Sequence, residues 1–256
     1  MRAIWRPEFA KGIPGMENPV LYLPIATTVL SAVFAWVVFQ RFRRQARAWH
    51  LGWWAAGIFL FGLGTFTEGY TAVFGWNEAI FRSWYISGAL LGGAPLAQGT
   101  VYLLLSRRVA HGLSLLLVPY IAVAAVFVLL TPVDAAIAEE HRLSPNVIEW
   151  TWVRAFSSLI NTYAFIFLVG GAILSAMRYR DAGGHRGRVT GNILIAVGAI
   201  LPGIGGAFTR AGYTEVLYVT EFIGIILIYF GYRLNVAERP GGEEAETGRS
   251  ASLASA

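Results

Sequence analysis

Seven long apolar stretches recur along the chain, separated by short polar connections. A stretch of about 20 mostly apolar residues can cross the hydrocarbon core of a bilayer as a helix. Such segments must be helical, because lipid offers no hydrogen-bond partner for free backbone groups. The pattern therefore predicts an all-α polytopic membrane protein, a seven-helix bundle with spans at residues 20–39, 51–74, 79–105, 113–130, 150–174, 189–208 and 214–232.

The composition supports a single compact bundle in the membrane. Of the 256 residues, 56% are hydrophobic and only 14% are charged, which is little charge for a soluble domain of this size. We expect an external tail at residues 1–19, the seven-helix domain at residues 20–237, and a disordered cytoplasmic tail at residues 238–256. The net charge of +5 does not indicate nucleic-acid binding, because the arginines cluster at span ends rather than in a basic stripe.

The distribution of basic residues predicts the orientation of the chain. Twelve arginines lie in the connections after spans one, three, five and seven, whereas only five Lys and Arg residues lie on the opposite side. Positively charged connections stay in the cytoplasm. We therefore expect a multi-pass protein of the inner cell membrane, with the N-terminus outside, the C-terminus inside, and the longest loop, residues 133–149, outside.

Two similar turns indicate an internal repeat. The segment Gly-Trp-Asn-Glu-Ala-Ile-Phe at residues 75–81 resembles Gly-Tyr-Thr-Glu-Val-Leu-Tyr at residues 212–218, at an offset of 137 residues. Each turn joins the second and third helix of a three-helix unit. Spans one to three and five to seven would then form parallel repeats linked by the fourth span, a 3+1+3 plan. Chance similarity between two glycine–aromatic turns is the alternative.

This plan resembles the architecture of SWEET-type sugar carriers and vitamin carriers, and seven spans with an external N-terminus also resemble microbial rhodopsins. The resemblance is confined to architecture, because the chain carries no sequence motif of either group, and we assign it to no family. In rhodopsins a lysine of the seventh helix binds retinal. Lys11 is the only lysine of this chain and lies outside the spans, so a retinal Schiff base is excluded.

Ionisable residues inside the spans mark the candidate site. Glu68 and Glu221 lie about 9 Å and about 10 Å below the predicted outer ends of spans two and seven, given the rise of a helix. Arg82 and Arg154 lie closer to the outer ends of spans three and five. A charge in hydrocarbon is costly and normally faces a cavity or a partner. We therefore predict an outward-facing polar pocket, with the two carboxylates below and the two guanidinium groups above.

Helical spacing places further polar residues beside this pocket. Arg154, Ser158 and Asn161 share one face of span five, and Tyr218 shares a face of span seven with Glu221. Each assignment has a plainer alternative. An arginine near a span end can extend to lipid headgroups, and a buried acid can form a structural ion pair or stay protonated. We interpret Arg210 as a loop charge rather than as a ligand.

The sixth span contains Pro202 and Gly203 near its middle. Proline removes a backbone donor and glycine loosens the backbone, so we expect a kink or a break that acts as a hinge. Transporters bind solutes at broken helices near the midplane of the membrane. A static kink without a binding role is the alternative.

We expect no cofactor, no metal site and no assigned catalytic residue. The chain has no cysteine, and its four histidines lie outside the predicted spans. Thiolate chemistry and haem ligation by paired histidines within the bundle are therefore excluded. No sequence motif for hydrolysis within the membrane is present.

Three functions fit the predicted pocket. The first is a carrier for a small polar or anionic solute, coupled to protons through Glu68 or Glu221. The second is a sensory or regulatory protein that acts through a partner, and the third is a lipid-modifying enzyme that uses one of these acids as general acid or base. We favour the carrier over the enzyme. The lipid bilayer and a small-molecule ligand are the expected partners, nucleic acid is not, and a homo-oligomer is left open.

Overall fold

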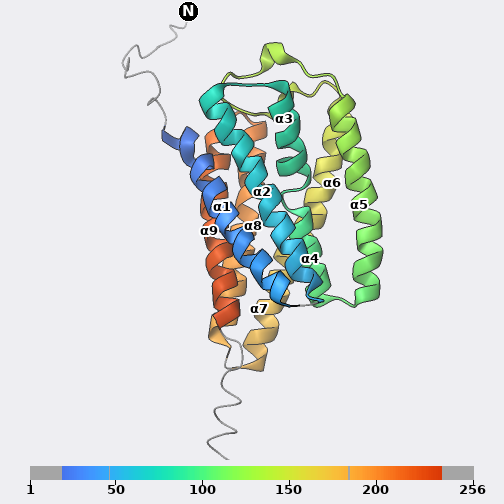
Figure 1. Ribbon diagram of the computed structural model, residues 1–256, viewed down its shortest axis with the longest axis vertical. Helices are drawn as coiled ribbons and strands as arrows, with labels where there is room; N and C mark the ends of the chain where they lie inside the picture. The colour runs from blue at the N-terminus through green and yellow to red at the C-terminus, as the bar shows by residue number, and fades with distance from the viewer. Residues whose placement is uncertain (1–18, 46, 184, 238–256) are drawn as a thin grey trace, which may run out of the picture.

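The computed structural model describes residues 19–45, 47–183 and 185–237, which fold into helices joined by short loops (Figure 1). The predicted tails at residues 1–19 and 238–256 lie outside these described residues, apart from Pro19. The described residues form no β-strand, only an isolated antiparallel bridge between Val133 and Ile148. The helices are α1 (Leu23–Arg44), α2 (Trp49–Phe74), α3 (Glu78–Trp84), α4 (Ala94–Leu104), α5 (Arg107–Leu130), α6 (Arg154–Ala164), α7 (Gly170–Ala182), α8 (Arg186–Arg210) and α9 (Thr214–Ala237).

Two predicted spans contain irregular backbone. The span expected at residues 79–105 is not one continuous helix, because α3 passes into a π-helical segment, Tyr85–Leu90, and α4 begins only at Ala94. A Cβ on Gly92 would lie 2.5 Å from the carbonyl oxygen of Gly88, so this break requires glycine. A second π-helical segment, Phe165–Val169, joins α6 to α7. In contrast, α8 continues through Pro202, where a kink or a break was expected, and no break is present.

Apolar helix faces dominate the surface. Five helical segments are long and apolar enough to cross a membrane, namely Pro19–Arg44, Arg107–Leu130, Thr151–Ala182, Arg186–Arg210 and Thr214–Ala237. Outward-facing side chains include Leu115, which is 74% exposed, and Phe59, which is 62% exposed. Exposed apolar surface on this scale is unusual in water but suits contact with lipid. The described chain is therefore an all-helical protein compatible with several membrane crossings.

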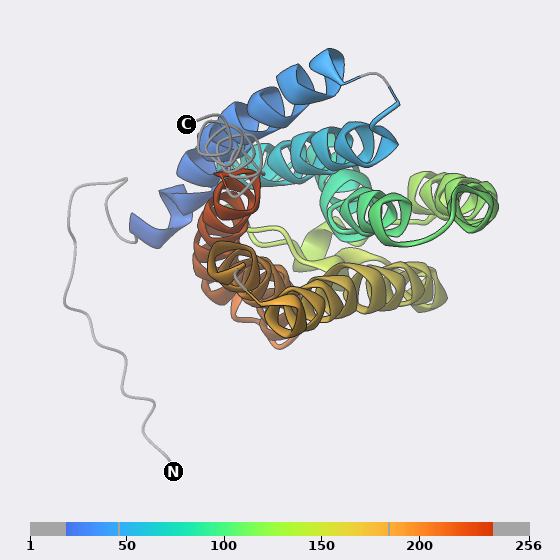
Figure 2. The same ribbon diagram turned by 90° about the horizontal axis from the view of Figure 1, so that it is seen from below.

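Close glycine contacts hold α8 and α9 together. These two helices pack side by side along their length, as α1 and α2 do, and α1 also lies against α9 (Figures 1 and 2). A Cβ on Gly198 would lie 2.7 Å from the carbonyl oxygen of Gly224, and a Cβ on Gly224 would lie 2.7 Å from that of Gly198. The two backbones are therefore in contact, which any side chain at these positions would prevent.

The helix α5 lies at the edge of the bundle (Figure 2). Its buried residues, among them Ala110, Leu117 and Ala124, form a single narrow stripe. A buried amide fixes this stripe, because Gln98 of α4 donates from Nε2 to the carbonyl oxygen of Ala110 at 2.9 Å and to Ser114 Oγ at 2.8 Å. A peripheral position suits α5 as the helix that links the two predicted three-helix units. The repeat itself stays a prediction.

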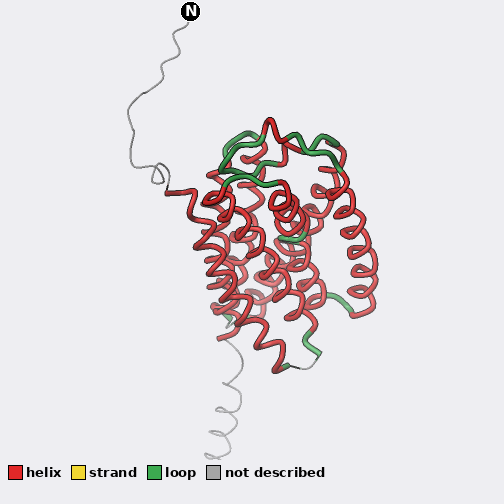
Figure 3. Tube along the Cα trace, turned by 45° about the horizontal axis from the view of Figure 1, so that its top comes forward, coloured by secondary structure: helices red, strands yellow, loops and turns green. Residues whose placement is uncertain are grey.

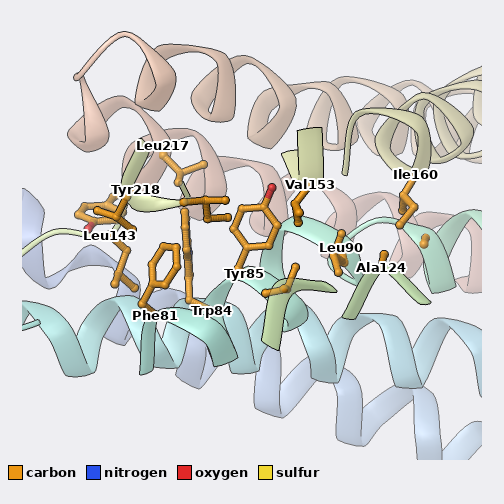
Figure 4. Packing of buried hydrophobic residues seen from close by; sticks show 14 of the residues in the cluster. Phe81, Trp84, Tyr85, Leu90, Ala124, Leu143, Val153, Ile160, Leu217 and Tyr218 are labelled. Carbon is orange, nitrogen blue, oxygen red and sulfur yellow. The ribbon is translucent and has the colours of Figure 1, made fainter. Parts of the chain in front are cut away.

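The connection between α5 and α6, residues 131–153, folds over one end of the bundle, which we call the loop end (Figures 1 and 3). Its residues Leu143 and Ile148 are 1% exposed and belong to the same core cluster as Phe81 (Figure 4). Arg142 of this connection forms an ion pair with Glu215 in the first turn of α9. The connection therefore ties α3, α5, α6 and α9 together at the loop end.

Replacing Gly198 by alanine should destabilise the protein, because the added methyl group would push α8 and α9 apart. Overpacking of this kind costs about 1–3 kcal/mol. Gly206→Ala is the matched control on the same helix, because a Cβ there meets no atom within 4 Å and alanine favours a helix over glycine. Thermal unfolding in detergent should place Gly198→Ala below the parent and Gly206→Ala at or above it. Equal melting temperatures for the two variants would contradict the close packing.

Candidate functional site

A cavity of about 330 Å³ lies between α2, the first π-helical segment, α6, α8 and α9. Its wall is mostly apolar, but Glu68 and Glu221 both line it, and we call it the acidic cavity. A volume of this order is typical of sites for small molecules. The structure therefore brings the two sequence-predicted acids, which are far apart in the chain, to one hollow.

The carboxyl group of Glu68 is enclosed by the bundle, with only 1% of the residue exposed. Its Oε1 accepts a hydrogen bond of 2.8 Å from Trp84 Nε1, while its Oε2 has no hydrogen-bond partner among the described residues. Glu221 comes from α9, and the two carboxyl groups are close enough to interact directly. Buried polar atoms are nearly always hydrogen-bonded, so an unpartnered carboxyl oxygen beside a cavity indicates a place for a proton or a ligand.

A glycine pair sets the position of this acid. A Cβ on Gly64 would lie 3.0 Å from Gly88 Cα, so α2 and the first π-helical segment are in backbone contact there. Glu68 lies four residues after Gly64, and Trp84 lies four residues before Gly88. Residues four apart share a helix face, so in antiparallel segments the glycine contact brings Glu68 and Trp84 together one turn away.

Irregular backbone borders the acidic cavity on two sides, and a helix that contains a proline borders it on a third. The first π-helical segment contributes Gly88 and Ala89 to the wall, and the second contributes Phe165 and Leu168. The third side is α8, which contributes Pro202. π-Helical turns occur frequently at functional sites, and proline removes a helix hydrogen bond. The helices around the acids are therefore less uniform than those that face lipid.

Three other predicted site residues also line the acidic cavity. They are Asn161, Pro202 and Gly203. Asn161 Nδ2 donates a hydrogen bond of 3.2 Å to the carbonyl oxygen of Ala89, so it joins α6 to the first π-helical segment. Pro202 and Gly203 lie inside the continuous helix α8.

The two predicted arginines lie outside the acidic cavity. Arg82 forms an ion pair with Glu78 at 2.7 Å and donates to the carbonyl oxygens of Val128 and, at 2.9 Å, Thr131. It therefore caps the end of α5, where free carbonyl groups attract a cation. Arg154 donates to backbone and side-chain oxygens of the 131–153 connection, including the carbonyl oxygen of Ile148 at 3.3 Å. Both guanidinium groups hold the loop end together instead of covering the acids.

Ser158 and Tyr218 also lie outside the wall of the acidic cavity. Ser158 is exposed, and its Oγ donates to the carbonyl oxygen of Arg154 at 3.4 Å. Tyr218 is 1% exposed and packs in the core cluster beside Leu217 (Figure 4). Its hydroxyl group has no hydrogen-bond partner among the described residues, although the ring lies within electrostatic range of both acids.

Arg210, which the sequence indicated as a loop charge, lines the acidic cavity as the last residue of α8. Gly203, Ala207 and Arg210 lie four and three residues apart, so they share one face of α8. This spacing in the sequence could have indicated that Arg210 lies on the cavity side of the helix. These three residues are exposed, as are Asn161 and Phe165 on the facing wall. The acidic cavity therefore opens sideways, between α6 and the loop-end half of α8.

A second cavity, of about 370 Å³, lies toward the end of the bundle opposite the loop end. Its wall includes two arginines and, within the described parts of the chain, no Asp or Glu, and we call it the basic cavity. Four apolar residues line both cavities, and we call them the apolar septum. They are Ile58, Leu96, Leu168 and Ile228. No pattern in the sequence indicated the basic cavity. Arg41 and Arg188 belong to the basic connections from which the orientation of the chain is predicted.

Replacing Trp84 by phenylalanine should remove the donor to Glu68 while keeping a ring in the core. The loss of a hydrogen-bond partner for a buried acid costs about 1–3 kcal/mol. We expect a double-mutant cycle of Trp84→Phe with Glu68→Leu, which removes the acceptor, to give a coupling energy of about 1 kcal/mol or more in thermal unfolding. Trp76→Phe is the matched control, since Trp76 Nε1 has no hydrogen-bond partner among the described residues. Additive effects in the Trp84 cycle would contradict the bond.

The described residues contain no group of three or more His, Cys, Asp or Glu residues that could hold a metal ion. Comparison with known proteins adds no assignment. No protein-family model, no curated protein sequence and no solved structure matches the chain.

Proposed function

We propose that this protein carries a small solute across the membrane by way of the acidic cavity and the basic cavity. The observation that carries the proposal is the apolar septum, whose four residues line both cavities. A carrier needs access to its solute from each side of the membrane in turn, and a barrier between the two access routes that can rearrange. Two cavities that meet at one thin apolar wall supply these parts, whereas a sensor needs only one cavity.

Seven crossings with the loop end outside are part of the proposal. Five segments are apolar enough to cross by themselves, and α2 is 26 residues long, about 39 Å at the rise of a helix. The seventh crossing is the broken segment from α3 to α4. Irregular backbone is tolerated within a membrane where it lines a cavity, as it does here. The basic connections then place the acidic cavity toward the outside and the basic cavity toward the cytoplasm.

The acid pair supports coupling to protons. Two carboxyl groups that share a buried site cannot both be ionised at low cost, so the pair is stable with one shared proton. Trp84 provides a donor to Glu68, which is buried. Glu221 as a whole residue is half-buried, although its Oε2 is enclosed, and we assign to it the exchange of the proton with water in the cavity. Arg210 at the opening favours a polar or anionic solute.

The predicted repeat is consistent with the same function. Its offset of 137 residues aligns Trp84 with Glu221 and aligns α2 with α8. The two groups that face Glu68 would then occupy corresponding places in the two three-helix units. A relative movement of the units would change the contacts of Glu68 directly, which would link protonation to the arrangement of the cavities.

A lipid-modifying enzyme is the second candidate, and one observation favours it. The acidic cavity opens sideways between α6 and α8, which would give a lipid access to Glu68 and Glu221. Incubation of the purified protein with labelled lipids separates the candidates, since a carrier leaves the lipid unchanged and an enzyme yields a product.

Single cysteines should report the movement of the two cavities, because the chain has no cysteine of its own. Ala207→Cys lies at the opening of the acidic cavity, and Ser175→Cys lies in the wall of the basic cavity. We expect acidification to change the two maleimide-labelling rates in opposite directions in proteoliposomes, because protonation of the acid pair favours one arrangement. Each rate is divided by that of glutathione at the same pH, since the reactive thiolate fraction itself falls with pH. Couplings of this kind are typically about 5- to 150-fold.

The variant Glu221→Gln should abolish this response in both reporters, since it removes the proton that the pair exchanges. Glu140→Gln is the control, because Glu140 is an exposed acid of the 131–153 connection and should leave the response intact. Normalised rates that rise or fall together in the two single-cysteine proteins that keep Glu221 would contradict alternating access. A response that survives Glu221→Gln would exclude the acid pair as its origin.

A further inference from the structure

The basic cavity has a strongly asymmetric charge. Arg41 of α1 and Arg188 of α8 line it together with His50 of α2, and no Asp or Glu is among the described residues of its wall. Arginines from separate helices that face one hollow raise its electrostatic potential, more so where the surroundings are apolar. Such a hollow attracts an anion and disfavours a cation.

Each of these two arginines packs on a tyrosine ring of the same wall. The Arg41 guanidinium carbon lies 5.7 Å from the centre of the Tyr232 ring, and Arg41 Nη1 also donates to Tyr232 Oη at 3.3 Å. The Arg188 guanidinium carbon lies 5.1 Å from the centre of the Tyr179 ring. A cation over an aromatic ring is attracted by the negative face of the ring. Both guanidinium groups are therefore held at the wall of the basic cavity, and a guanidinium group has the planar set of N–H donors that matches an oxyanion.

A pair of side-chain amides, one buried and one half-buried, fixes the backbone beneath Arg188. Asn192 is 8% exposed and donates from Nδ2 to Asn235 Oδ1 at 3.1 Å and to the carbonyl oxygen of Arg188 at 2.8 Å. Asn235 in turn donates to the carbonyl oxygen of Gly231 at 2.9 Å. Both amides line the basic cavity. This network locks α8 to α9 beside the arginine, as expected for a site that is formed before its ligand arrives.

The inner part of the same cavity is apolar. Phe34 and Val38 of α1 are at most 2% exposed and line it, and the apolar septum closes it toward the acidic cavity. A volume of about 370 Å³ accommodates more than a bare inorganic ion, which would leave the apolar wall uncovered. The matching ligand carries an anionic group at one end and an apolar chain at the other.

We propose that the basic cavity binds an amphipathic oxyanion, with a phosphate or carboxylate group held by Arg41 and Arg188 and an apolar chain lying against the septum. Two sources share this chemistry, an anionic lipid headgroup and a soluble alkyl oxyanion. The assignment of this ligand as the transported solute rests on the proposed carrier function, whereas the binding site itself does not.

Calorimetric titration of octyl phosphate into the protein tests the site. The full chain is reconstituted in nanodiscs of neutral phosphatidylcholine, and the heat from protein-free nanodiscs is subtracted. We expect octyl phosphate to bind at least tenfold more tightly than octanol or inorganic phosphate. Octanol lacks the anionic group that the arginines bind, and inorganic phosphate lacks the apolar chain. Arg41→Gln and Arg188→Gln should each weaken octyl phosphate binding at least tenfold.

Arg43→Gln is the matched control, since Arg43 is an exposed residue of α1 outside the basic cavity and its loss changes the net charge equally. Arg41→Lys keeps the charge and should retain more binding than Arg41→Gln, which separates recognition from a folding defect. No binding of octyl phosphate by the parent protein, equal binding of octanol, or an equal loss in Arg43→Gln would overturn the proposal.

Nanodiscs that contain phosphatidylglycerol distinguish the two sources. Weaker octyl phosphate binding in these discs, dependent on Arg41 and Arg188, would support a lipid headgroup as the natural occupant, whereas unchanged binding would support a soluble alkyl oxyanion. These titrations involve no movement between cavities. Octyl phosphate binding that persists while the cysteine reporters show no opposite response to pH would overturn the carrier function and leave the anion site in place.

Discussion

An acid enclosed in an apolar bundle needs a hydrogen-bond donor, and the bond from Trp84 Nε1 to Glu68 Oε1 meets that need here. The packing of the segments around the acidic cavity allows this bond to form. The glycine contact between α2 and the first π-helical segment brings donor and acceptor together, and the break after that segment gives the chain room to continue as α4. The second carboxyl oxygen stays unpartnered among the described residues, facing the place that Glu221 reaches from α9.

Charge and apolar surface alternate along the bundle. Along α9, Glu221 lines the acidic cavity, Ile228 belongs to the septum, and Asn235 lines the basic cavity. These residues are seven apart, so each step covers about 10 Å along the helix. In the proposed carrier, a solute that moves between the cavities would meet an acid pair, then a short apolar barrier, then two arginines. We propose this order for an amphipathic anion, with a proton held at the acid pair.

The level of a residue along the bundle was easier to predict than its partners. The sequence indicated that Glu68 and Glu221 lie at similar depth, and the structure brings them to one cavity. The same reasoning assigned Arg82 and Arg154 to them as partners, yet these arginines bind carbonyl groups of the loop end. A long guanidinium side chain can reach free backbone oxygens that lie several residues away in space. Sequence position gives the height of a side chain along its helix but not the direction of its tip.

The sequence by itself determined that the chain forms long apolar helices, where most of them begin and end, and which two acids are buried within them. Apolar length and the energetic cost of a buried charge act locally along the chain, so they can be read from it. Only the tertiary structure decided that Glu68 meets Trp84, that Arg210 borders a cavity and that four residues separate two hollows. These features depend on which helix faces lie against one another, and that choice is made by glycine contacts between segments far apart in sequence.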